Sequence, residues 1–177
     1  MADGAQDGRS ADGALASITM SRPSALRRLR SLVESGPTRQ LLVAEAASAL
    51  LWARISLLRM PFQRLAADWG QLVPAGDPAI ATKPGPVEAI RTARAIGWAV
   101  TATASIMPFK AMCIQQAVAA HGMLMRRGVA SVVHYGVGHG DDGSLVAHVW
   151  LEAAGVEVTG YPVPASIAEI GAFVPPR

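Results

Sequence analysis

The chain has 177 residues, of which 51% are hydrophobic and 16% are charged, so it is long enough for one domain with a substantial core and is not disordered throughout. Its net charge of +3 is slight, and apart from Arg27, Arg28 and Arg30 its basic residues are scattered, which argues against nucleic-acid binding. The single cysteine excludes a disulfide within the chain, and with the lack of a signal-peptide pattern it predicts a reducing, cytoplasmic environment.

The beginning of the chain predicts a tail and a first helix. Residues 1–20, rich in Ala, Gly, Asp and Ser, are expected to form a flexible tail, and residues 21–177 a single domain. A helix is predicted over 23–34, because Pro23 suits its first turn and a glycine-proline pair follows its end.

A long apolar helix is predicted next, from the N-cap Thr38 to about Arg59. It is hydrophobic on most faces, which is typical of a membrane span. Glu45, Arg54 and Arg59 interrupt it, however, and leave no uncharged stretch of eighteen residues. A buried core helix is therefore the first interpretation, a helix lying on a membrane or on a partner's surface the second, and membrane association is not expected.

The middle of the chain predicts three more helices around a loop. A short helix is expected over 62–69, and a surface loop over 71–86, where prolines and glycines gather. Apolar residues then recur every three or four positions over 87–106, which predicts a helix that Pro108 ends. The next helix is predicted over 110–127.

The end of the chain predicts a sheet. A glycine that suits a helix C-cap, Gly128, is followed by alternating apolar runs that predict strands over 129–137, 145–153 and 156–161. Helices over 23–127 followed by an antiparallel sheet of three or more strands over 129–161 give an α+β fold.

Cys113 and His148 are the candidate catalytic residues. Cys113 lies near the start of a predicted helix, where the peptide dipoles favour the nucleophilic thiolate, and on the face of Ala117, Ala120 and Leu124 that should pack inward. His148 lies in a predicted strand. A thiol facing an imidazole is the minimal machinery of a cysteine hydrolase or acyl transferase, although a lone buried cysteine is often only a core residue.

A longer set of motifs resembles a known family, the B2 proteins of lasso peptide biosynthesis. These are transglutaminase-like cysteine proteases related to the C-terminal domain of the microcin J25 processing protein. The resemblance covers roughly residues 39–173 and rests mainly on 113–160. Its motifs are Cys113-Ile114-Gln115-Gln116-Ala117-Val118-Ala119, Leu124-Met125-Arg126-Arg127-Gly128-Val129, Gly136-Val137, Ala147-His148-Val149-Trp150-Leu151-Glu152 and Gly155.

The resemblance implies a papain-like, transglutaminase-like core with Cys113 as nucleophile and His148 as base. It also implies an endopeptidase that removes the leader from a lasso peptide precursor and needs no cofactor. The partners implied are the precursor peptide, a small leader-recognition protein and an ATP-dependent cyclase of the asparagine-synthetase type. The predicted helices of the first hundred residues lack the strand-rich start of a recognition domain, so that protein is expected to be a separate chain.

The third member of the triad is where this sequence departs from the family. Members with a full triad carry an aspartate at the position matched by Gly160, so a backbone carbonyl, a water or a partner protein is left to orient His148. The isolated enzyme is then expected to be slow and to be accelerated by its partners. Gly160→Asp should partly replace that help, provided that Gly160 does not need a positive φ angle.

The acidic residues nearby are weaker candidates for the third position. Glu152 lies on the same face of its strand as His148 but about 13 Å along it, too far for contact, and Glu157 should lie closer to Glu152. Asp141 and Asp142 are expected in a solvated turn. Trp150 should share the face of His148 and form a wall of the site.

The remaining histidines suggest no metal site. His134 and His139 flank a glycine-rich segment and with His148 could suggest a zinc site, which needs three or four ligands brought together by geometry. His134 is expected on a strand and His139 in a mobile glycine-rich turn, so metal binding is not expected. His121 is expected to be exposed because it lies off the apolar face of its helix. Two other functions remain open for this core. One is acyl transfer to an amine, and the other is a non-catalytic scaffold with a degenerate triad.

Overall fold

The computed structural model describes residues 36–140 and 142–176. The predicted tail and the predicted helix over 23–34 lie outside these residues, as does Asp141. The helices described are α2 (Gly36–Arg59), α3 (Phe62–Ala66), α4 (Val87–Ala104) and α5 (Cys113–Met125), with 3-10 turns η1 (Ala67–Trp69) and η2 (Pro78–Ile80). The strands are β1 (Gln71–Pro74), β2 (Ser131–His139), β3 (Leu145–Ala153), β4 (Val156–Thr159) and β5 (Ile167–Val174).

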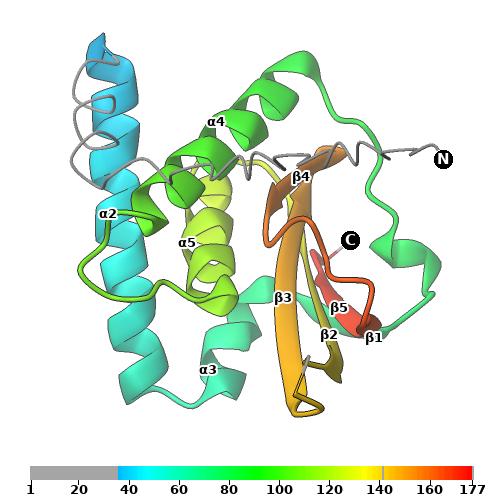
Figure 1. Ribbon diagram of the computed structural model, residues 1–177. Coiled ribbons are helices and arrows are strands. Elements are labelled where there is room, and N and C mark those ends of the chain that lie inside the picture. Colours follow the sequence, from blue (N-terminus) through cyan, green and yellow to red (C-terminus); the bar gives the residue numbers. More distant parts are fainter. Residues whose placement is uncertain (1–35, 141, 177) are drawn as a thin grey trace, which may run out of the picture.

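The architecture is a helical layer on one face of a single antiparallel sheet (Figure 1). The strand order is β1-β5-β2-β3-β4, so the last strand lies between the first and second strands of the chain. α5 packs against β3 and α4 against β4, while α2 covers the outer side of α5 and α4. The predicted α+β class is confirmed.

Within the described residues, the helices predicted from residue 38 onward and the three predicted strands are found, with shifted ends. The cysteine helix is shorter than predicted, because it begins at Cys113 itself and ends at Met125; Gly128 then adopts a φ of 66° after it. Two strands were not predicted. β1 lies within the segment expected to be a loop, and β5 pairs with both β1 and β2 beyond the expected end of the sheet.

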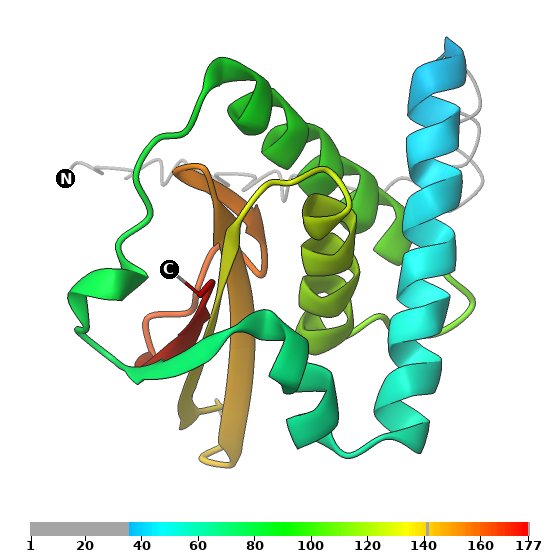
Figure 2. The same cartoon turned by 180° about the vertical axis from the view of Figure 1, so that it is seen from behind.

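Apolar side chains cover both faces of the sheet. On the helical side, fully buried residues from each layer form the main core, among them Leu50, Ile96, Met123, Leu124 and Leu151. On the other side, a smaller cluster joins three strands and is covered by the segment that contains η2, as the view from behind shows (Figure 2). The small cluster consists of Val73, Val132, Ala172 and Val174, with Ala79 and Ile80 packed against it.

The long helix α2 is buried along one side only. Ala46, Leu50, Ala53 and Ser56 are buried, which agrees with the prediction of a core helix for that side. In the described part of the chain α2 is the one helix whose length and composition would suffice to cross a membrane, and 22% of its most apolar stretch is buried. Its outer side therefore remains apolar and exposed.

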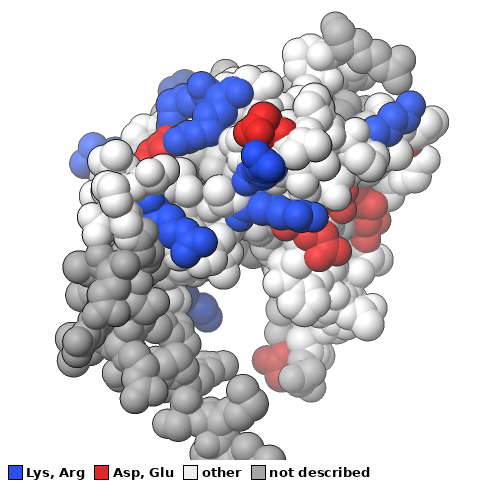
Figure 3. Space-filling view, turned by 90° about the horizontal axis from the view of Figure 1, so that it is seen from above, with Lys and Arg blue, Asp and Glu red and all other residues white. Residues whose placement is uncertain are grey.

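Charged side chains of both signs lie next to one another on the face seen from above (Figure 3). Arg91 pairs with Glu88 on α4. Glu45 of α2 accepts hydrogen bonds from both Arg126 and Arg127, which follow α5, with the shortest at 2.6 Å from Arg127 Nη2. The second group ties the outer helix to the helix that carries the cysteine.

Candidate functional site

Cys113 is the first residue of α5 and is half-buried. The turn before it is fixed by two hydrogen bonds: the Met112 N–H donates to Gln115 Oε1 at 2.9 Å, and Gln116 Nε2 donates to the Ala111 carbonyl at 2.9 Å. The backbone N–H groups of a first helical turn have no partner within the helix and present a positive end to the thiol. Cys113 thus has the position predicted for the nucleophile, at the N-terminus of a helix.

The inward face predicted for the cysteine helix is confirmed, since Ala117, Ala120 and Leu124 are completely buried. Cys113 lies one turn before them, where the core ends. The thiol therefore sits at the rim of the core, half open to solvent.

His148 lies in the middle of β3, on the side of the strand that faces away from the helices. Strand side chains alternate between faces, and here Val149 and Leu151 pack with the helical core. The imidazole stacks on the Trp150 ring, with centroids 5.9 Å apart and planes 20° apart. Trp150 thus shares the face of His148, as predicted, and forms a wall for its ring.

The imidazole of His148 is held by the backbone of Gly160. His148 Nε2 lies 2.6 Å from the Gly160 carbonyl oxygen, and because a carbonyl only accepts, Nε2 carries the hydrogen. The lone pair of the neutral ring is then on Nδ1. The group that orients the base is a carbonyl, one of the three alternatives that the sequence left open.

No side chain fits at Gly160. Its φ is 84°, and a Cβ there would lie 2.5 Å from the Val149 carbonyl oxygen and 2.8 Å from Trp150 Cα. Gly160→Asp is expected to help only if Gly160 does not need a positive φ angle. That condition is not met, because an aspartate would be strained and would collide with the backbone of β3. At position 160, the oxygen that orients His148 therefore belongs to the main chain.

The Cys113 thiol and the His148 imidazole lie on opposite sides of β3. No hydrogen bond joins them within residues 36–140 and 142–176. β4 pairs with β3 only over Leu151–Ala153. Next to His148 the edge of β3 is therefore lined by Gly160 rather than by another strand. A reaction between the two groups requires the imidazole to reach the thiol around this edge.

Glu152 fixes the segment after β4 that carries Gly160. Its carboxylate accepts a hydrogen bond of 2.6 Å from the Tyr161 hydroxyl and another of 2.6 Å from Thr82 Oγ1. Burial and the hydrogen bond to Glu152 raise the pKa of Tyr161, so the phenol keeps its proton. Glu152 contacts the residue after Gly160, and the prediction that it does not contact His148 directly agrees with these bonds.

His134 extends the aromatic stack away from the sheet edge. Its ring is nearly parallel to Trp150, with centroids 5.4 Å apart, and its Nδ1 lies 2.7 Å from Glu169 Oε1. Glu169 and Thr82 were not predicted as part of the site. Glu169 belongs to the unpredicted β5, and Thr82 reaches the sheet only through the fold of the 75–86 segment.

Three expectations about polar residues near the sheet have clear outcomes. His121 is buried, not exposed as predicted, because β2 folds onto α5 and places Ser131 Oγ 2.9 Å from His121 Nδ1. Asp142 lies in an exposed turn, where the Ser144 hydroxyl and N–H donate to it and lower the pKa of its carboxyl. Glu157 is exposed and pairs in register with Glu152, as expected.

In the part of the chain that the structure describes, no group of three or more His, Cys, Asp and Glu side chains is arranged to hold a metal ion. His139 is exposed at the end of β2. His134 is engaged with Glu169.

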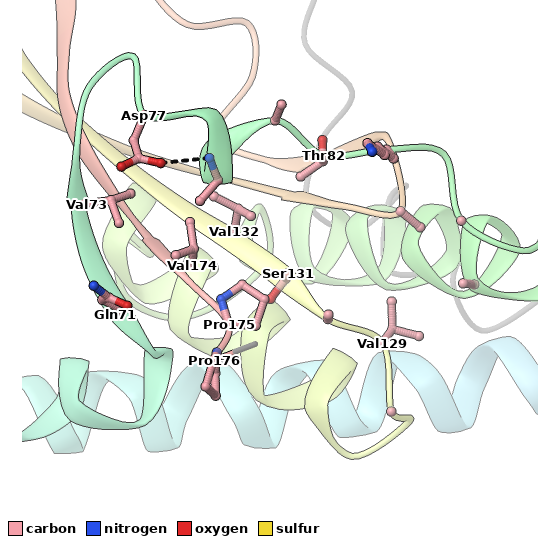
Figure 4. Close-up of a pocket in the computed structure, with 18 of the residues that line it drawn as sticks. Gln71, Val73, Asp77, Thr82, Val129, Ser131, Val132, Val174, Pro175 and Pro176 are labelled. Carbon is pink, nitrogen blue, oxygen red and sulfur yellow. Dashed lines mark hydrogen bonds between the residues drawn. The ribbon is translucent and has the colours of Figure 1, made fainter.

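A cavity of about 870 Å³ lies on the sheet face opposite the helices (Figure 4). Val73, Val132 and Val174 form its apolar floor, and Asp77, whose carboxylate accepts from the Ala79 N–H, lies at its edge. Thr82 lines the cavity and donates its hydroxyl to Glu152, which also accepts from Tyr161. Neither Cys113 nor His148 lines the cavity.

Comparison with known proteins identifies the family. The sequence profile described as the Transglutaminase-like superfamily matches residues 47–170, from the middle of α2 into β5 and more than two thirds of the chain. No curated protein and no solved structure matches. With its nucleophile candidate at a helix start and its histidine on the adjoining sheet, the chain belongs to the transglutaminase-like superfamily.

Proposed function

We propose that the chain is a cysteine endopeptidase that removes the leader peptide from a lasso peptide precursor. The observation that carries the chemistry is the hydrogen bond between His148 Nε2–H and Gly160, which leaves the lone pair of the imidazole on Nδ1, together with a thiol at the first position of α5 on the adjoining layer. The motif resemblance from 113 to 160 carries the substrate class.

In this mechanism His148 Nδ1 takes the proton of the Cys113 thiol, and the thiolate attacks the scissile carbonyl carbon. The resulting oxyanion is stabilised by the backbone N–H of Cys113, which no helical carbonyl occupies. The protonated imidazole gives its proton to the leaving amine, and a thioester remains. His148 then activates a water that hydrolyses the thioester and frees the thiol.

The hydrogen bond to Gly160 suits both halves of this cycle. The carbonyl accepts from Nε2–H in the neutral ring and in the imidazolium, so the ring keeps its orientation while the proton moves on Nδ1. A carbonyl carries no full charge, however, and stabilises the imidazolium less than a carboxylate does. This weaker support is the reason to expect slow turnover by the isolated chain.

The proposed partners follow from the resemblance: the precursor peptide, a separate leader-recognition protein and an ATP-dependent, asparagine-synthetase-like cyclase. No cofactor is required by the mechanism, and the proposed location is the bacterial cytoplasm. Binding of a partner beside β3 would order the edge around which the imidazole must reach the thiol.

The test is to mix the purified chain with a precursor and its recognition protein and to measure the masses of the products. Hydrolysis gives free leader and a core peptide with a new N-terminus. A product with a new isopeptide bond would instead assign acyl transfer, which the superfamily also includes. If the precursor stays unchanged with all partners present, the chain is a non-catalytic scaffold and not a peptidase.

Cys113→Ala should abolish leader release and leave the fold intact, because a small residue at a half-buried site opens little cavity. His148→Ala should reduce the rate to the same level, and the double variant should be no slower, since the two residues act as one unit. The control is His139→Ala, which removes an exposed histidine from the same sheet. Cleavage by Cys113→Ala at the wild-type rate would refute the proposal.

A further inference from the structure

The outer side of α2 is an exposed apolar stripe. Five large side chains are turned to solvent there, and at 100° per residue they fall on the side opposite the buried Ala46, Leu50 and Ala53. Figures 1 and 2 both show this helix at the outer edge of the molecule. The stripe consists of Leu41, Leu51, Trp52, Ile55 and Leu58, exposed by 73%, 49%, 56%, 40% and 75%.

The charges around this stripe are positive. Arg59 continues it in the last turn of α2, and Arg126 lines a groove beside Trp52, between α2 and α5. The acid of this region, Glu45, is already bridged by Arg126 and Arg127, so the three groups leave a net charge of one sign. An apolar helix side with cationic residues at its margins matches the boundary of an anionic lipid bilayer.

The sequence immediately before α2 adds to the same charge. Arg22, Arg27, Arg28 and Arg30 lie within fifteen residues of its start, against a single acid, Glu34. Arginine clusters next to an apolar helix are attracted to anionic lipid headgroups near the membrane surface.

We propose that α2 docks lengthwise on an anionic lipid bilayer, with the stripe from Leu41 to Leu58 in the boundary between headgroups and acyl chains. The helix lies on the bilayer and does not cross it, because its other side forms the protein core: Ala46, Leu50 and Ala53 have no exposed surface. From the sequence, a helix lying on a membrane surface is only the second interpretation, because charged residues interrupt the helix. Folding pairs Glu45 with Arg127 and stacks Arg54 on Phe109, at 4.7 Å, which leaves the stripe itself without a charge before Arg59.

The test is co-sedimentation of the full chain with vesicles of phosphatidylglycerol and phosphatidylcholine, and with vesicles of phosphatidylcholine alone. We expect at least tenfold stronger partitioning onto the anionic vesicles, decreasing as salt is added. Leu58→Glu should lower that partitioning at least tenfold. The matched control is Leu145→Glu, which introduces the same charge at a leucine of equal exposure, 74%, at the start of β3, and should bind like the wild type.

Three results would overturn the proposal. Equal partitioning onto both kinds of vesicle would show that charge plays no part in binding. Partitioning of Leu58→Glu equal to that of the wild type would show that the stripe plays no part. The third is absence of vesicle binding with self-association in light scattering that Leu58→Glu abolishes, which would assign the stripe to a second copy of the chain. Circular dichroism of both glutamate variants shows that the fold is retained, since both leucines are exposed.

Discussion

At the scale of single residues, the hydrogen bond from His148 to Gly160 holds the candidate base by a main-chain atom. Gly160, whose carbonyl oxygen lies 2.6 Å from His148 Nε2, adopts a left-handed φ of 84°. The same conformation excludes a Cβ, which would meet the backbone of β3. The carbonyl contact and the absence of a side chain at position 160 thus go with one backbone conformation.

Gly160→Ala should therefore lower the free energy of unfolding by about 1–3 kcal/mol, because it combines a strained φ with a collision against Val149. The measurement is urea unfolding. Gly143→Ala is the control, since Gly143 also has a positive φ, 77°, but nothing within 4 Å of its Cβ. An effect no greater than that of the control would show that the backbone around Gly160 adjusts to a side chain. Gly160→Asp would then be worth testing as a source of the third triad residue.

Sequence alone placed several site residues correctly relative to their own elements. Cys113 at a helix start, His148 and Trp150 on one strand face, and Gly160 opposite His148 all follow from local period and from the turn at 154–155. His121 could not be placed in this way. The period of α5 puts it off the helical apolar face, and only the docking of Ser131 from β2 buries it.

At the scale of elements, Glu45 joins α2 to the end of α5. The Arg127 guanidinium, and after it that of Arg126, lowers the pKa of Glu45 from 4.5 to about 2. A carboxyl whose pKa is lowered on folding stabilises the folded state above its unfolded pKa, here above about pH 4.5. That contribution is lost as the pH falls through about 2.

Glu45→Gln should accordingly cost about 1–2 kcal/mol of unfolding free energy at pH 7, after allowance for the partial exposure of the group, and progressively less below pH 4.5. Unfolding in urea at pH 7, 4 and 3 checks this. Glu88→Gln is the control, because the Glu88–Arg91 pair is exposed by 80% and 72% and should contribute nothing measurable. A cost that is constant with pH would mean that packing, and not charge, joins the helices.

Helices were easier to predict than the sheet because their signal is local. The period of 87–106 and the proline and glycine stops around α3 and α4 need no knowledge of the rest of the fold. β1 is four residues long and ends in proline, and in β5 small residues such as Ala168 and Gly171 weaken the alternation. Each becomes a strand by pairing with the other, a contact that no local pattern contains.

At the scale of the whole molecule, β5 holds the sheet together. It pairs with β1 on one side and with β2 on the other, so its removal leaves both strands without their hydrogen bonds to β5. A chain ending at residue 166 retains every element predicted from the sequence and both candidate catalytic residues. We nevertheless expect it not to fold, because the apolar cluster of Val73, Val132, Ala172 and Val174 loses two of its four members.

Circular dichroism and cooperative unfolding of this truncation check the expectation. The matched control ends at Val174 and should fold like the full chain, since β5 is then complete. A cooperative, wild-type-like transition for the chain ending at residue 166 would show that β2, β3 and β4 form a stable sheet with the helices by themselves.

The pairing of Gln71 with Val174 also constrains the order in which the protein can form during synthesis. About a hundred residues separate these partners, and loops of that size make sheet closure late and slow compared with local helix formation. The ribosome must release the chain through residue 174 before β5 can complete its pairing with β1 and β2. Until then β2 presents an unpaired apolar edge, and the nascent chain is most exposed to aggregation in this interval.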